Sequence, residues 1–184
     1  MRTYIFFIIA IVALATFSSC GDKPEGSSAE KDKYGSKVIV GDRAPNFVVF
    51  NATDNLFQTS DLAGRKTLLL LFDIACPHCR NEFPIINQVW ENLKDDPQCN
   101  VVTISRVTAD NTREQDMETV LKWWSDHDFT MPIFFDNNRA AYNVFATAYI
   151  PRIYIIGSKG IIQWMKVGRS NLTADELTKL VKTI

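Results

Sequence analysis

The sequence has little histidine, almost no net charge and no apolar run long enough to cross a membrane. Its two histidines are His78 and His127, which excludes a His-rich metal site. The 20 basic and 21 acidic residues give a formal net charge of −1, with no long basic run. The charge therefore gives no electrostatic basis for binding nucleic acid. The uncharged stretch of residues 4–17 is shorter than the roughly 20 residues that a membrane-spanning helix needs.

The N-terminus instead has the pattern of a secretory signal. Arg2 precedes residues 4–17, and two serines follow them at the expected cleavage point. A cysteine directly after small residues, here Cys20, resembles a bacterial lipoprotein signal, in which that cysteine becomes the lipidated first residue. We therefore expect a signal peptide over residues 1–19 and a lipid anchor on Cys20, with the protein held in the cell envelope and facing the periplasm. The alternative is an ordinary signal peptide and an incidental cysteine, because Phe17 stands where many lipoprotein signals carry Leu.

The rest of the chain divides into a tether and one domain. Residues 20–37 are rich in Gly, Ser, Lys and Glu, lack apolar periodicity and are typical of a flexible tether. Residues 38–184 are expected to form a single domain, and the apolar content of 46% is ample for a packed core. Export places this domain in an oxidising compartment, where disulfides persist.

Hydrophobic periodicity predicts strands and helices in alternation. Strands are expected at residues 38–40, 46–50, 56–59, 66–72, 100–106, 132–135, 152–156 and 161–167. Helices are expected after Cys79, from a Thr112/Gln115 capping box, at residues 138–145, and from a Thr173/Glu176 capping box. Helical crossovers require parallel central strands, and the glycine-flanked turn at residues 157–160 adds an antiparallel hairpin. We expect an α/β fold with a mixed central sheet, helices on both faces and an N-terminal β extension.

Two cysteines separated by two residues stand where strand 66–72 gives way to a helix. The motif is Cys76-Pro77-His78-Cys79. If Cys76 starts the helix, Cys79 lies one turn later and the two sulfurs can bond. Unpaired amide N–H groups and the helix dipole then stabilise a thiolate on Cys76. Pro77 suits the first turn, where its missing N–H costs nothing. The spacing therefore predicts a thiol–disulfide redox pair.

The same spacing also fits a structural disulfide or half of a zinc site. Tetrahedral zinc needs four ligands, and His78, lying between the cysteines, is badly placed to join Cys76, Cys79 and Cys99. Arg80 stands where a c-type haem attachment motif requires His. Cys99 precedes a buried strand and is expected to be a small buried hydrophobe. We expect neither a metal nor a cofactor.

Three motifs match one known pattern. Gly41-Asp42-Arg43-Ala44-Pro45-Asn46-Phe47 fits the opening G-x-x-A-P-x-F, and Cys76-x-x-Cys79-Arg80-x-Glu82-x-Pro84 fits the run C-x-x-C-R-x-E-x-P. Tyr149-Ile150-Pro151 before the hairpin fits a cis-proline loop. Together they resemble the thioredoxin fold, and within it the TlpA/ResA-like branch of exported thiol–disulfide oxidoreductases. This resemblance implies a cis Pro151, a substrate polypeptide bound to the backbone of Ile150, and a membrane-embedded dithiol donor.

The sequence departs from that pattern near the cysteines. Ala75 replaces the Trp that usually precedes the first cysteine. Leu70 stands where many thioredoxins bury an acid that serves the second thiol. Glu82 is a candidate for that proton transfer, or else a solvated acid in the first turn of the helix. Asp73 is nearer to Cys76, and we expect it in the turn.

The residues of the motif predict a redox mechanism. We expect Cys76 to attack a substrate disulfide and Cys79 to resolve the mixed disulfide. His78 is expected to favour the Cys76 thiolate and so to make the pair more oxidising, as in DsbA-like oxidases with the same dipeptide. The scaffold favours reduction of protein disulfides, and the dipeptide favours the reverse direction, a dithiol oxidase. The same fold could also serve a thiol peroxidase or a non-enzymatic binding lipoprotein, although peroxiredoxin-like enzymes carry Thr where Asp73 stands.

Overall fold

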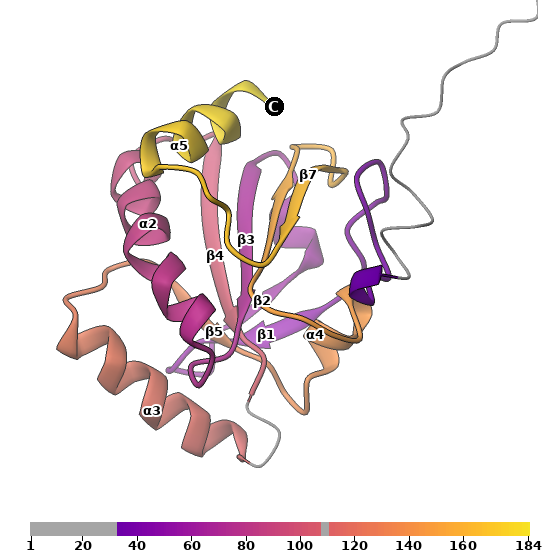
Figure 1. Ribbon diagram of the computed structural model, residues 1–184. Helices are drawn as coiled ribbons and strands as arrows, with labels where there is room; N and C mark the ends of the chain where they lie inside the picture. Colours follow the sequence, from indigo (N-terminus) through magenta and orange to yellow (C-terminus); the bar gives the residue numbers. More distant parts are fainter. Residues whose placement is uncertain (1–32, 108–110) are drawn as a thin grey trace, which may run out of the picture.

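The fold is built on one seven-stranded β-sheet. The structure, a computed structural model, describes residues 33–107 and 111–184. The predicted signal peptide, Cys20 and the first part of the predicted tether lie outside the described residues. The strands are β1 (Val48–Phe50), β2 (Leu56–Gln58), β3 (Lys66–Phe72), β4 (Cys99–Ser105), β5 (Ile133–Phe135), β6 (Arg152–Ile156) and β7 (Ile162–Val167). Their order across the sheet is β2-β1-β5-β4-β3-β6-β7 (Figure 1).

The central strands are parallel and the outer ones antiparallel, as the sequence predicts. β3 pairs in parallel with β4, and β4 with β5. β6 runs antiparallel to both β3 and β7, while β1 runs antiparallel to β2 and β5. The β1–β2 hairpin is the N-terminal β extension. The predicted fold class is therefore confirmed.

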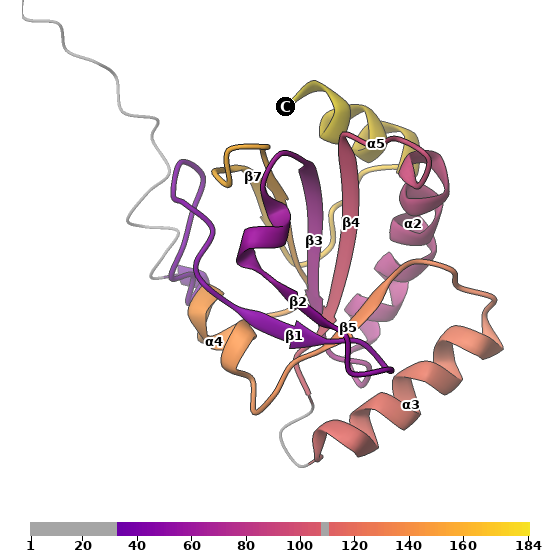
Figure 2. The same ribbon diagram turned by 180° about the vertical axis from the view of Figure 1, so that it is seen from behind.

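Helices cover both faces of the sheet (Figures 1 and 2). They are the 3-10 helix η1 (Thr59–Leu62), α2 (Pro77–Leu93), α3 (Arg113–Asp126), α4 (Ala140–Phe145) and α5 (Ala174–Thr183). α2, α3 and α5 share one core with Leu68, Leu70 and Phe72 of β3. η1 and α4 share the other core with Leu69 and Leu71 of the same strand. β3 is thus buried on both faces, as its almost continuous apolar sequence predicts.

The predicted strand at residues 38–40 is wrong. A turn takes its place, in which the Asp42 carboxylate accepts the Ile39 N–H at 3.0 Å and Gly41 has a φ of +93°. This segment meets the sheet through an isolated bridge between Arg43 and Ile161. The turn chemistry of adjacent Gly and Asp outweighs the β propensity of a short apolar run.

Residues 34–37, here called the N-terminal strap, bind the chain that runs from α4 towards β6. The Lys37 N–H bonds to the Phe145 carbonyl at 2.9 Å, and the Thr147 N–H bonds to the Gly35 carbonyl at 2.8 Å. Contacts with the domain therefore begin within the predicted tether. Composition alone does not reveal them, because they use the backbone donors and acceptors that every sequence offers.

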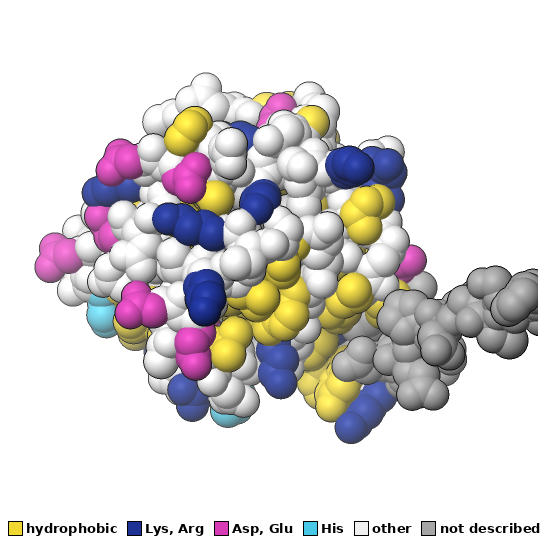
Figure 3. Space-filling model, turned by 90° about the horizontal axis from the view of Figure 1, so that it is seen from above, with side chains coloured by type: hydrophobic (Ala, Val, Ile, Leu, Met, Phe, Trp, Pro, Cys, Tyr) yellow, Lys and Arg dark blue, Asp and Glu magenta, His cyan; other side chains and the backbone are white. Residues whose placement is uncertain are grey.

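Charged side chains of both signs are interspersed over the face seen in Figure 3, and hydrophobic side chains gather between them. This mixture is in keeping with a net charge of −1. Within the described part of the chain, none of the helices combines the length and apolarity that crossing a membrane requires.

Candidate active site

The Cys76-Pro77-His78-Cys79 motif begins α2, directly after β3. Cys76 is the N-cap residue, with φ −82° and ψ 115°, and Pro77 follows as the first residue of the helix. The Cys76 N–H bonds to the Asp73 carbonyl at 3.1 Å, and the Cys76 carbonyl accepts the Arg80 N–H at 3.1 Å. The helix therefore starts at the predicted residue, and the positive end of its dipole lies at Cys76.

The two cysteines of the motif differ in exposure. Cys76 is half-buried, whereas Cys79, one turn later, is 0% exposed. Both are thiols. Burial raises the pKa of the Cys79 thiol far above its ordinary value of 9.0, and the neighbouring Cys76 raises it further, while a backbone hydrogen bond with Asp73 acts in the opposite direction. A disulfide that arrives from solvent can therefore reach Cys76 but not Cys79.

The raised pKa of Cys79 predicts a loss of stability at alkaline pH. Above pH 9.0 the unfolded chain releases this proton while the native state keeps it. The thiol's contribution to the free energy of unfolding is therefore fully present below pH 9.0 and is lost as the pH rises further. Urea unfolding under reducing conditions at pH 9 and 10 measures the loss. We expect the wild type to lose up to about 1.4 kcal/mol more than Cys79→Ala over that unit of pH. Equal losses in the two proteins would contradict the prediction.

The loop before β6 lies beside the cysteine turn. β6 pairs antiparallel with β3, with Arg152 opposite Leu71, so Pro151 lies at the end of β3 from which the chain enters the cysteine turn. The Ile150-Pro151 bond is cis, as predicted. Pro151 is buried, and both Ile150 and Cys76 pack at the margin of the same core cluster. Within residues 33–107 and 111–184, no group hydrogen-bonds to the Ile150 N–H or C=O. A polypeptide chain could therefore pair with this residue.

Asp73 occupies the turn between β3 and Cys76, as expected, and is 5% exposed. One carboxylate oxygen accepts the Ala75 N–H at 2.9 Å, and the other lies 3.4 Å from the Arg106 Nε. Arg106 follows β4 and also lies over the ring of Tyr142, 5.0 Å from its centroid. The carboxylate thus helps to shape the turn that presents Cys76.

Glu82 is buried, with 0% exposure, so the interpretation of this residue as a solvated acid is wrong. Its two carboxylate oxygens accept the Ser170 N–H at 3.1 Å and the Ser170 hydroxyl at 2.8 Å. The half-exposed guanidinium of Arg169 lies 3.6 Å away. Glu82 comes one helical turn after Cys79, so the two side chains lie on the same face of α2. Its burial depends on the segment between β7 and α5, which is remote in sequence.

The remaining candidate residues differ in their distance from the site: Pro77 and His78 belong to the motif itself, and Cys99 does not. Pro77 and His78 are exposed at the first turn of α2. Cys99 is 3% exposed at the opposite end of the sheet, because it pairs with Lys66 at the start of β3. Burial also raises the pKa of the Cys99 thiol. The structure therefore brings together the motif, Glu82 and the cis-proline loop, and it leaves Cys99 apart.

One residue of the site region was missed. Arg152 directly follows the cis proline and is 0% exposed. The available signal was a charged side chain at the start of an otherwise apolar strand. A charged side chain at a buried position indicates dedicated partners, because it is almost never buried without them.

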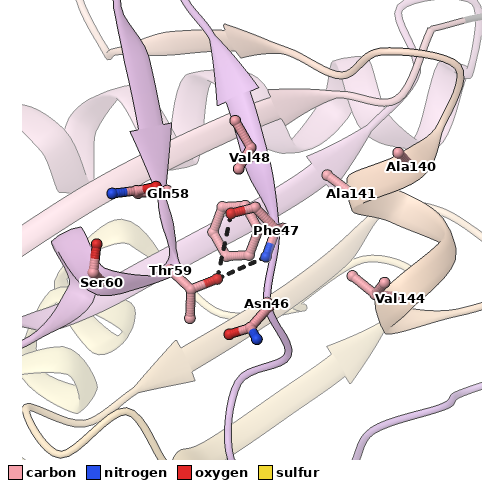
Figure 4. Close-up of a pocket in the computed structure, with 9 residues that line it drawn as sticks. All are labelled: Asn46, Phe47, Val48, Gln58, Thr59, Ser60, Ala140, Ala141 and Val144. Carbon is pink, nitrogen blue, oxygen red and sulfur yellow. Dashed lines mark hydrogen bonds between the residues drawn. The ribbon is translucent and has the colours of Figure 1, made fainter.

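A separate pocket of ≈ 470 Å³ lies between the β1–β2 hairpin and α4 (Figure 4). Phe47, Val48 and Val144 contribute apolar lining, and Thr59 closes one side by accepting the Phe47 N–H at 2.7 Å. None of the predicted site residues lines it. The pocket is therefore distinct from the cysteine site.

Known proteins are similar to this chain in sequence and in fold. The family model described as the AhpC/TSA family matches residues 40–165. The thiol-disulfide oxidoreductase YkuV of Bacillus subtilis is 28% identical over 112 residues, which cover 60% of this chain and 73% of that protein. The thiol-disulfide oxidoreductase ResA of Bacillus cereus is 24% identical over 136 residues, covering 74% of this chain and 72% of ResA. The solution structure of a candidate protein disulfide isomerase from Bacteroides thetaiotaomicron superposes with a TM-score of 0.69 at 24% identity, over 82% of this chain and 90% of the other. The chain thus belongs to the AhpC/TSA family, and it is a thiol-disulfide oxidoreductase with a thioredoxin-like fold.

Proposed function

We propose that this protein is exported, is anchored in the cell envelope by a lipid on Cys20, and reduces disulfides of other proteins with the Cys76–Cys79 pair. Residues 1–19 would be removed as a signal peptide, and the segment from Cys20 to the N-terminal strap would act as the tether. The domain would face the periplasm. The anchor is proposed from the sequence pattern at Cys20.

The observation that carries the proposal is the difference in exposure between the two thiols. Cys76 is half-buried at the positive end of α2, whereas Cys79 lies beneath it with 0% exposure. A nucleophile must be reached by its substrate, while a resolving thiol needs only to reach the first sulfur. This arrangement supports Cys76 as nucleophile and Cys79 as resolving residue.

The reaction proceeds in two exchanges. The Cys76 thiolate attacks one sulfur of the substrate disulfide, forms a mixed disulfide and expels the other substrate sulfur as a thiolate, which takes up a proton. Cys79 then loses its proton, and its thiolate attacks the Cys76 sulfur and expels the second substrate sulfur as a thiolate, which takes up a proton. Two electrons pass to the substrate, and the Cys76–Cys79 disulfide remains. A membrane-embedded dithiol donor would return these electrons.

The second exchange needs a proton acceptor, because burial raises the pKa of Cys79. We assign that role to Glu82, which is buried and shares a helix face with Cys79. Pro77 and His78 lie at the exposed first turn, where His78 can favour the Cys76 thiolate by charge or hydrogen bonding. The substrate chain would pair with the backbone of Ile150 beside Pro151.

Assays of the wild-type protein test this function and its direction. With dithiothreitol as electron donor, we expect insulin disulfides to be reduced well above the rate with dithiothreitol alone, and hydrogen peroxide to be consumed at the background rate. The reduction potential of the pair should lie nearer to about −270 mV than to about −120 mV, the values of thioredoxin and DsbA. Peroxide consumption without insulin reduction would favour a peroxidase, and a potential near the DsbA value would favour a dithiol oxidase.

A further inference from the structure

Arg152 is a buried cation whose partners are mainly backbone carbonyl groups. It is 0% exposed, and among the described acidic residues none forms an ion pair with it. Its Nε donates to the Tyr149 carbonyl at 3.0 Å and to the Ala148 carbonyl at 3.2 Å, and its Nη2 donates to the Ala148 carbonyl at 2.6 Å. A buried charge is tolerated only where its hydrogen bonds are satisfied. Here these bonds go to the two residues that lead into the cis-proline loop.

The same guanidinium holds the N-terminal strap. Its Nη1 donates to the Ser36 hydroxyl at 2.8 Å, and its Nη2 donates to the Tyr34 carbonyl. The rings of Tyr34 and Tyr149 meet edge to face, with centroids 5.8 Å apart. Arg152 therefore joins the strap to the loop before Pro151, although the two segments are more than a hundred residues apart in the sequence.

The loop needs such support because Tyr149 has a left-handed backbone, with a φ of +64°. Residues with side chains rarely adopt this conformation, and it persists only where the surroundings enforce it. The Tyr149 carbonyl accepts hydrogen bonds from the Arg152 Nε, at 3.0 Å, and from the Tyr142 hydroxyl, at 3.1 Å. Tyr149 is itself 59% exposed and directly precedes Ile150. The conformation of Tyr149 therefore sets where the unpaired backbone groups of Ile150 point.

We propose that Arg152 is a positioning residue which, together with the strap, fixes residues 148–150 in the conformation that binds the substrate polypeptide. The planar fork of Arg can hold several carbonyls at once, which the single ammonium of Lys cannot do. The proposal rests on the proposed function in one respect, namely that Ile150 binds the substrate chain. The strap thereby takes part in substrate recognition, although it does not take part in the chemistry of the cysteines.

A glycine in the strap allows a test that leaves Arg152, the loop and the cysteines unchanged. Gly35 has a φ of +60°, and a Cβ placed there would lie 2.4 Å from the Thr147 hydroxyl and 3.1 Å from the Ala148 N. Gly35→Ala should therefore push the strap off the loop. Gly64→Ala is the matched control, because its φ of +81° carries a similar backbone strain but its Cβ would meet nothing within 4 Å.

We expect Gly35→Ala to raise KM for insulin about tenfold, with kcat within about twofold of the Gly64→Ala value, because binding and not chemistry depends on the loop. Hydrogen exchange of Thr147, whose N–H bonds to the Gly35 carbonyl at 2.8 Å, should become faster in Gly35→Ala and in Arg152→Lys, but not in the control. If KM and exchange in Gly35→Ala equal those of the control, the proposal is overturned.

The exchange measurement separates this proposal from the proposed function. If the wild type itself fails to reduce insulin, the proposed function is contradicted and the link to substrate binding fails with it. Exchange then decides whether the strap and Arg152 fix the loop. Unchanged hydrogen exchange in both Gly35→Ala and Arg152→Lys would contradict the claim that the strap and Arg152 fix the loop.

Discussion

Replacing Cys76 by Ser is expected to abolish reduction of insulin disulfides, with turnover falling to the rate of dithiothreitol alone. A serine hydroxyl cannot form the mixed disulfide, because the exchange requires a sulfur nucleophile. Cys99→Ala is the matched control, because Cys99 is a thiol of the same chain at the opposite end of the sheet. Unchanged turnover in Cys76→Ser would remove the proposed mechanism.

The partner substitution separates the roles of the two cysteines. Cys79→Ala leaves Cys76 able to attack but removes the thiol that resolves the intermediate. We expect a covalent complex with insulin chains that survives non-reducing electrophoresis and is absent in Cys76→Ser. If Cys79→Ala accumulates no such complex while Cys76→Ser does, the roles are reversed.

Glu82→Gln is expected to lower turnover about a hundredfold, the lower end of what a positioned acid or base contributes. The amide keeps the shape of the side chain and can still accept a hydrogen bond from Ser170, but it cannot take the Cys79 proton. The mixed disulfide should therefore accumulate in the wild-type cysteine background. Raising the pH should partly offset the loss, because the small deprotonated fraction of Cys79 grows about tenfold per unit of pH below its raised pKa.

Two measurements keep this prediction distinct from a folding defect. Glu118→Gln, an exposed position on α3, serves as control and should turn over like the wild type. Urea unfolding of Glu82→Gln shows whether the buried contacts with Ser170 survive the substitution. A mixed disulfide that resolves as fast as in the control, in a folded variant, would mean that another group accepts the proton.

Sequence alone predicts the parts of this fold that depend on neighbouring residues. β3 was predicted with its observed bounds, Lys66–Phe72, because a strand buried on both faces is continuously apolar. The capping boxes of Thr112 with Gln115 and of Thr173 with Glu176 are both formed, since each needs only residues three apart. The helix predicted from the Thr112/Gln115 box is α3, and its Trp124 lies in the core, with its Nε1 donating to the Met131 carbonyl at 3.1 Å.

The features that could not be predicted depend on distant contacts. Glu82 is buried by Ser170, which lies 88 residues along the chain. Arg152 is buried by Ser36, at a separation of 116 residues. No local pattern reports such pairings, because the polar residue and its partner meet only after the sheet has formed. The cis-proline loop was found through its family resemblance, and the groups that support it became visible only in the structure.

If Cys20 carries the proposed lipid, the strap also limits how far the domain can lie from the bilayer. Because residues 34–37 are fastened to the domain, only the chain from Cys20 to residue 33 would then link the lipid to the domain. A chain of that length can extend at most about 50 Å. Every target of Cys76, as well as the proposed donor, would then have to come within that length plus the distance across the domain from the strap to Cys76.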